Sequence, residues 1–182
     1  MSPNYSLKRT AAYRRLCYHA VTRQRPLSSS VRPAMKYFTP EWWSSGCEGA
    51  DDVFGKYQRY IDSVRDLLPK AALDFNANHT LHDSEVKQIV CDFKSREVEL
   101  TLHGWDTRFE AKTRYSLCFA GVVMFEQLYP QEEYVESELG DLGYWEWEAG
   151  PEGTELRLLF VSSATFRLVF KGFSFKHGAL QA

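Results

Sequence analysis

The sequence has no long apolar run and no cysteine motif, and these absences argue against a membrane protein and a disulfide-stapled scaffold. No stretch approaches the roughly 20 apolar residues that a membrane-spanning helix needs, so we expect no membrane segment. The four cysteines are widely spaced, and none forms a C-x-x-C pair. Scattered cysteines without an export signal indicate a reducing compartment, and we therefore expect a cytoplasmic protein.

The motifs of the common catalytic and nucleotide-binding sites are also missing. The 11 glycines are dispersed and form neither G-x-G-x-x-G nor G-x-x-x-x-G-K, the loops that cradle phosphates. No G-x-S-x-G sequence exposes a nucleophilic serine, and no cysteine stands in a recognisable Cys/His setting. We therefore predict no catalytic residue and no cofactor, and the sequence favours a binding protein over an enzyme.

One long segment has no acidic residue, and another has no Lys or Arg. Residues 1–35 contain seven Lys and Arg and no acid, which leaves 15 cations against all 24 acids in the rest of the chain, a net charge near −9. No Lys or Arg lies between Arg114 and Arg157, where ten acids occur. An acidic domain repels phosphates and attracts cations, so we expect the folded domain to bind a basic protein rather than nucleic acid.

Length and composition indicate a single folded domain. The chain has 182 residues, of which 44% are hydrophobic and 15% aromatic, enough for one core. We place this domain at residues 35–177, followed by a tail at residues 178–182. Residues 1–34 lack apolar periodicity and are broken by prolines, so we expect a disordered basic arm. Its composition is compatible with a transit peptide, a nucleic-acid-binding tail or read-through upstream of a start at Met35.

Three N-terminal segments have helical signals. Thr39 followed by Pro40 is typical of a helix start, because Thr caps the first N–H groups and Pro fits the first turn. A longer helix, capped by Asp51 or Asp52, carries apolar side chains at three- and four-residue spacing: Val53, Tyr57, Tyr60, Ile61, Val64, Leu67 and Leu68. The following proline ends it, and a second short helix is predicted at residues 70–75.

From residue 89 onward, apolar residues recur at every second position, which is the period of a β-strand. We expect strands at residues 89–93, 98–102, 109–119, 122–128, 144–148, 156–160 and 166–170, with Phe173 and Phe175 extending the last one. Short connections force antiparallel pairing of consecutive strands. Helices first and strands afterwards predict an α+β fold, with the N-terminal helices packed on one antiparallel sheet of about six to seven strands.

The acidic interval between Arg114 and Arg157 also contains interleaved Tyr and Trp residues, and it predicts a partner-binding surface. An acidic field steers cationic partners, while Tyr and Trp supply the anchors that dominate interface energy. We therefore predict a docking surface for a basic protein, made of Glu132, Glu133, Tyr134, Glu136, Glu138, Trp145, Glu146, Trp147 and Glu148. The alternative is a solubilising loop whose rings point inward, with Glu146 and Glu148 as solvated side chains of a surface strand.

His79, His82 and Asp83 lie close together in the sequence and form the candidate metal or acid–base site. Two imidazoles and a carboxylate could bind zinc or move a proton. However, metal sites usually draw ligands from separate elements, and no C-x-x-C or H-E-x-x-H motif accompanies these residues. An Asp just before a strand more often makes a local turn, so a metal-dependent enzyme is the alternative hypothesis.

Several short motifs resemble those of an uncharacterised family of small bacterial proteins. They are M-K-Y-F-T-P-E-W-W at Met35–Trp43, the helix end at residues 67–69, and Leu81-His82-Asp83 before the first strand. The last motif, with the strands after it, is also similar to that of some polymorphic-toxin immunity proteins. The resemblance covers most of residues 35–177 and implies a bacterial cytoplasmic protein of α+β or mostly β fold, with no catalytic residues to carry over.

The arm carries a second resemblance. Its sequence SLKRTAAYRRL…LSSSVRP resembles the translated recombination-site tracts that flank reading frames in bacterial integron gene cassettes. This resemblance implies that Met35 is the native start and that the arm is upstream sequence.

Three functions follow from these observations. The leading hypothesis is a non-enzymatic protein-binding module, an immunity-type inhibitor with an acidic–aromatic surface. A metal-dependent enzyme is the second, and a small-molecule-binding domain lined by Trp42, Trp43 and Trp105 is the third. A homo-oligomer is compatible with all three.

Overall fold

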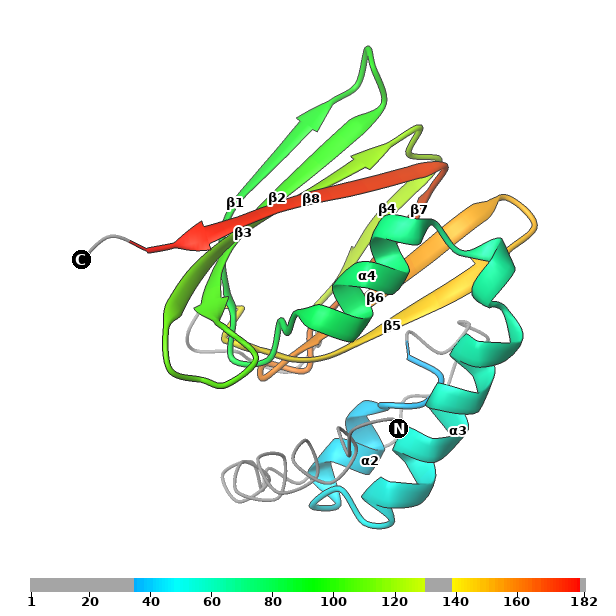
Figure 1. Ribbon diagram of the computed structural model, residues 1–182, viewed down its shortest axis with the longest axis vertical. Coiled ribbons are helices and arrows are strands. Elements are labelled where there is room, and N and C mark those ends of the chain that lie inside the picture. The colour runs from blue at the N-terminus through cyan, green and yellow to red at the C-terminus, as the bar shows by residue number, and fades with distance from the viewer. Residues whose placement is uncertain (1–34, 130–138, 181–182) are drawn as a thin grey trace, which may run out of the picture.

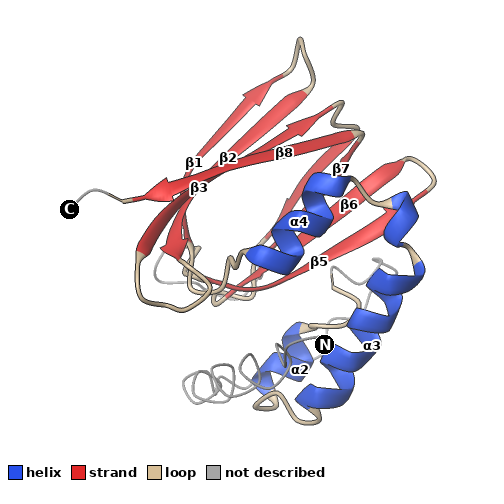
Figure 2. Ribbon diagram, in the orientation of Figure 1, coloured by secondary structure: helices blue, strands red, loops and turns tan. Residues whose placement is uncertain are grey.

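The computed structural model describes residues 35–129 and 139–180, and within these ranges the chain is an α+β protein (Figures 1 and 2). Helices come first: α2 spans Pro40–Ser44, α3 Ala50–Ser63 and α4 Lys70–Asn78, with a 3-10 turn at Arg65–Leu67. Strands follow, which confirms the predicted fold class. The predicted arm at residues 1–34 lies outside the described residues. Among the helices of the described ranges, none has the length and apolar character needed to cross a membrane.

The helix ends follow local chemistry. Thr39 caps α2, and its hydroxyl oxygen accepts a hydrogen bond from the N–H of Trp42 at 3.2 Å, as the sequence predicts. Helix α3 differs from the prediction, because its cap is Gly49 and both predicted capping aspartates lie in its first turn. There their carboxylates face the positive end of the helix dipole, which is also favourable.

The strands form two antiparallel sheets of four strands each in the described part of the chain. They are β1 (Glu85–Asp92), β2 (Glu97–Trp105), β3 (Lys112–Ala120), β4 (Met124–Leu128), β5 (Leu142–Gly150), β6 (Gly153–Phe160), β7 (Thr165–Phe170) and β8 (Gly172–Ala179). The order is β1-β2-β3-β8 in the first sheet and β4-β7-β6-β5 in the second. The prediction of one sheet of six to seven strands is therefore wrong, and β8 continues past His177, where we expected the domain to end.

The chain crosses between the two sheets at two neighbouring connections, one from β3 to β4 and one from β7 to β8. Gly121 follows β3 with a φ of 62°, a left-handed conformation that glycine adopts without strain, and the chain then enters β4. The return crossing is at Lys171, whose N–H donates to the last carbonyl of β3 at 3.0 Å. The prediction that Phe173 and Phe175 extend the preceding strand is wrong, because both belong to β8 in the first sheet.

The opposite corner is closed by a bridge between the starts of β1 and β5. The N–H of Leu142 donates to the carbonyl of Ser84 at 2.8 Å, and the N–H of Asp83 donates to the carbonyl of Leu142 at 2.9 Å. Ser84 is fully buried against Gly104 of β2, where an added Cβ would lie 2.0 Å from the Ser84 hydroxyl oxygen. The sheets are therefore joined at both corners and enclose the core between them.

Helix α4 supplies the aromatic centre of this core on the β8 side. Figure 1 shows α4 between β8 and β5, with α2 and α3 lying beyond β5. Phe75 of α4 is fully buried, and its ring centroid is 5.0 Å from that of Phe175 and 5.8 Å from that of Tyr115. The interface is apolar on both sides, so burial of these rings stabilises the position of α4.

Helix α3 covers the edge of β5 that pairs with no other strand of its sheet. The hydroxyl oxygens of Tyr57 and Tyr60 accept hydrogen bonds from the N–H groups of Trp147, at 2.7 Å, and Ala149, at 3.0 Å. Burial raises the pKa of Tyr57, so its hydroxyl stays protonated. An unpaired strand edge is a liability, and here helix side chains satisfy it. We expected the helices to pack on one face of a single sheet, and this prediction is wrong.

Candidate functional site

Strand β5 carries four residues of the predicted partner-binding surface, and the structure buries three of them. Trp145 and Trp147 belong to the core and are 8% and 1% exposed. Glu146 lies on the other face of β5 and is 1% exposed, while Glu148 is half-buried. The predicted exposure is therefore wrong for β5, because the strand is covered on both faces. The remaining members, Glu132, Glu133, Tyr134, Glu136 and Glu138, lie outside the described residues.

Glu146 holds the segment before α2 against the second sheet. Its carboxylate accepts hydrogen bonds from three successive backbone N–H groups, those of Lys36 at 2.8 Å, Tyr37 at 2.5 Å and Phe38 at 2.7 Å. The same carboxylate lies 3.6 Å from the guanidinium of Arg157. A side chain that the sequence suggested was solvated is thus the anchor of a long-range contact.

Arg157 and Arg167 extend this contact into a buried ion-pair network. Arg157 donates to Glu155 at 2.5 Å and also pairs with Glu148, while Arg167 donates to Glu155 at 2.6 and 2.9 Å. Burial alone would raise the pKa of Glu155, but hydrogen bonds from Arg167 and the charge of Arg157 hold that pKa below its ordinary value. The paired charges of this network serve the fold rather than a ligand.

The structure does not bring His79 together with His82 and Asp83. His79 ends α4, and its ring lies 4.4 Å from that of His177 and 4.9 Å from that of Phe175, centroid to centroid. The Nδ1 atom of His82 lies 2.8 Å from the Asp83 carboxylate in a local pair at the start of β1. In residues 35–129 and 139–180, no three His, Cys, Asp or Glu side chains are grouped to hold a metal ion. The metal-site prediction is corrected accordingly.

His79 gives the fold a dependence on pH. Burial and the neighbouring His177 lower its pKa, and Asp74 opposes them only in part. Below pH of about 6.5 the unfolded chain therefore binds a proton more readily than the folded chain, so stability is lost as the pH falls. We expect the unfolding midpoint temperature to drop between about pH 7.5 and about pH 5.5, and to drop less in the His79→Phe variant. Equal drops in both proteins, with His103→Gln as control, would contradict this.

The three tryptophans proposed to line a small-molecule site do not meet. Trp42 and Trp43 pack their rings edge-on against Tyr144, at centroid distances of 5.1 and 5.3 Å. Trp105 lies at the end of β2, under the ammonium of Lys112 at 4.7 Å. The first two rings attach α2 to β5, and the third belongs to a different sheet. They therefore stabilise separate contacts.

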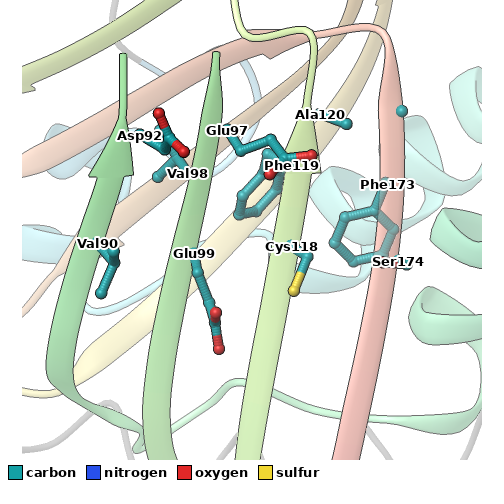
Figure 3. Close-up of a pocket in the computed structure, with 11 residues that line it drawn as sticks. Val90, Asp92, Glu97, Val98, Glu99, Cys118, Phe119, Ala120, Phe173 and Ser174 are labelled. Atoms are coloured by element: carbon teal, nitrogen blue, oxygen red, sulfur yellow. The ribbon is translucent and has the colours of Figure 1, made fainter. Parts of the chain in front are cut away.

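The outer face of the first sheet, which points away from the core, carries a site that the sequence reasoning missed. A shallow depression of about 430 Å³ lies on this face and is lined by residues from all four strands. Figure 3 shows these residues. Three of them are acids, Asp92, Glu97 and Glu99, and none is a lysine or arginine. We call these three residues the acidic end. Strand register places Glu99 beside Val90 and Cys118, so these side chains share the face.

The acidic end is charged and accessible. Backbone N–H groups of Ser95 and Lys94 donate to the Asp92 carboxylate at 3.2 and 2.8 Å and lower its pKa, so it stays ionised.

The signal for this site was present in the sequence but masked. Because two cations lie between Asp92 and Glu97 in the hairpin turn, the local charge sums to almost nothing, and only strand geometry separates the acids.

Comparison with known proteins adds no assignment: no family model matches the chain, and a search of curated proteins gives no match. The resemblances to a bacterial family, to immunity proteins and to integron cassettes therefore stay predictions.

Proposed function

We propose that this chain is a non-enzymatic binding protein whose acidic end engages a basic protein. The observation that carries the proposal is the depression lined by three carboxylates and by no cation. An acidic surface of this kind accelerates encounter with a cationic partner and disfavours anionic ones such as nucleic acid. The expected class of partner is kept, and its site is placed on the outer face of the first sheet instead of the interval that ends in β5.

Exposed apolar side chains beside the acids support a protein partner over a simple ion. Val90 is 47% exposed inside the depression, and Phe93 is 91% exposed at the tip of the β1–β2 hairpin. Aromatic anchors contribute most of the affinity of protein interfaces, while charged rims contribute rate and specificity. The β1–β2 hairpin presents an aromatic side chain and charged side chains next to each other.

The free edge of β1 supplies a way to bind an extended segment. Within the described residues β1 is an edge strand that pairs with β2, and the isolated bridge between Ser84 and Leu142 comes just before it. Edge strands recruit extended chains through backbone hydrogen bonds, and alternate side chains then meet the sheet face. A basic segment added to β1 would place every second side chain near Val90 and Asp92.

The partner that fits this proposal is a cationic toxin, which the chain would inhibit in the cytoplasm of a bacterium. This part of the proposal is supported by the resemblance of the L-H-D motif and its strands to immunity proteins, together with the acidic end. The alternatives have less support, because their candidate residues are dispersed in the structure. Identification of a neighbouring gene for a basic protein that binds this chain would strengthen it.

The proposal is tested with a labelled extended peptide of alternating lysine and valine. Fluorescence anisotropy should show saturable binding to the purified chain, weakened about tenfold in the variant Asp92→Asn, Glu97→Gln, Glu99→Gln, because exposed ion pairs contribute about 0.2–1 kcal/mol each. The matched control neutralises three exposed acids of the helical region: Glu41→Gln, Glu48→Gln and Asp66→Asn. Equal weakening by both variants would show that only net charge attracts the peptide, and the proposal would fail.

A further inference from the structure

The outer face also has a basic end, opposite the acidic end along the strands. Lys112 and Arg114 are exposed there, and Lys176 is exposed in the middle row of the face. Like the three acids, they make no ion pair with any described residue. Glu85, the acid that shares a row with Arg114, is paired with Lys87. The face is therefore dipolar, with unpaired charges of opposite sign at its two ends.

Strand register shows that the acidic end lies on one side of the middle row of the face and the basic end on the other side. The rows of paired residues are, in order, Asp92–Glu97–Ala120–Gly172, Val90–Glu99–Cys118–Ser174, Gln88–Thr101–Ser116–Lys176, Glu85–His103–Arg114–Gly178 and Trp105–Lys112. Beyond each end of the face, the sign of the charge changes again. The β1–β2 turn carries Lys94 and Arg96, and the turn after β2 carries Asp106 and Glu110.

We infer that the outer face is the interface of a two-fold symmetric homodimer, in which the acidic end of each copy lies on the basic end of the other. A two-fold axis across the strands at the Thr101–Ser116 row exchanges the ends. It sets Glu99 near Arg114 of the second copy and Glu97 near Lys112 of the second copy. An interface of this kind is isologous, so every complementary pair occurs twice.

The area of the face predicts a weak dimer. Four strands about 4.8 Å apart and eight residues rising about 3.3 Å each give a face of roughly 500 Å² per copy. Stable complexes bury about 800 Å² per partner, so we expect a concentration-dependent dimer that high salt dissociates. The exposed Val90 lies inside this face, where contact with a second copy would cover it.

This inference goes beyond the proposed function, because it needs the basic end as well as the acidic end and no other protein. If both hold, a basic partner and a second copy compete for Asp92, Glu97 and Glu99. Dimerisation would then keep the acidic end covered until a partner with higher affinity displaces the second copy.

Sedimentation of the purified full chain, with no peptide present, tests the inference. At about 20 mM salt the weight-average mass should rise from monomer toward dimer with concentration, and about 0.5 M salt should abolish the rise. Glu99→Arg and Arg114→Glu should each weaken dimerisation at least about tenfold, because each places like charges together twice. The double variant Glu99→Arg, Arg114→Glu should restore it.

The charge swap separates dimerisation from attraction by net charge. Glu48→Arg, at an exposed acid outside the face, should leave the dimer unchanged. A chain that stays monomeric at low salt, or a double variant that does not regain the dimer, would overturn the inference. Circular dichroism checks that each variant folds. If one does not, the swap of Glu97 with Lys112 replaces it. Peptide binding is measured separately, so either proposal can fail alone.

Discussion

Replacing Glu146 with glutamine is expected to lower the free energy of unfolding by about 3 kcal/mol, because a buried acceptor becomes partly a donor. One carboxylate oxygen accepts from Tyr37 and Phe38, and the other accepts from Lys36 and faces Arg157. Whichever oxygen becomes an amide, an N–H group is left facing another donor. The guanidinium also loses one of its buried counter-charges.

Urea denaturation measures this effect, with Glu152→Gln as the control. Glu152 is exposed in the β5–β6 turn, and its side chain is expected to contribute less than about 0.5 kcal/mol. If both variants have the wild-type stability, Glu146 does not anchor the segment before α2. Such a result would reopen the interpretation of Glu146 as a solvated side chain of a surface strand.

Substituting alanine for Gly153 should also destabilise the fold by about 3 kcal/mol or more, through backbone strain and a direct clash. Gly153 begins β6 with a φ of 142°, which side chains rarely permit. An added Cβ would lie 2.2 Å from the carbonyl oxygen of Phe170 in the neighbouring strand. The obstacle is backbone, so no side-chain rotation relieves it.

Gly178→Ala is the matched control for this substitution. Gly178 lies on β8, and a Cβ there would meet no atom within 4 Å. Thermal unfolding of the control should stay close to wild type, because the residue is exposed and unstrained. Wild-type stability of Gly153→Ala would mean that β6 and β7 do not lie together in the observed register.

Local structure was largely predictable from the sequence. Thr39 and Pro40 start a helix because the hydroxyl and the ring act on their immediate neighbours. The β1–β2 hairpin follows from the alternation at Ile89 and Cys91 and a short turn, but Phe93, expected in the strand, lies in that turn. Such signals act over a few residues, so they survive without knowledge of the rest of the chain.

The division into two sheets was not predictable in the same way. Period-two alternation says which face a side chain takes, but not which strand lies beside which. Gly121 has the conformational freedom for a bend, yet nothing near it in the sequence shows that the chain there enters a second sheet. The segment after the crossing at Lys171 looks like a continuation of β7, because Phe173 and Phe175 again occupy alternate positions. Their phase, however, is one residue out of step with that of Phe166, Leu168 and Phe170.

The candidate site shows the same limit. Glu146 and Glu148 have the spacing of exposed strand residues, and only the distant segment at Lys36 reveals that Glu146 is buried. The acidic end, in contrast, comes from residues close in sequence whose charge is masked by Lys94 and Arg96. The alternation of the hairpin would have separated these charges had each face been counted alone.

A residue-resolved titration tests most directly whether the acidic end is a binding surface. Two-dimensional ¹H–¹⁵N spectra of the isotopically labelled chain would be recorded as the lysine–valine peptide is added. Our account predicts that the amide shifts of Val90, Asp92, Glu97 and Glu99 move with one common affinity, while those of α2 and α3 stay in place. Changes confined to the helices or to β5, with the β1–β2 hairpin unmoved, would contradict it.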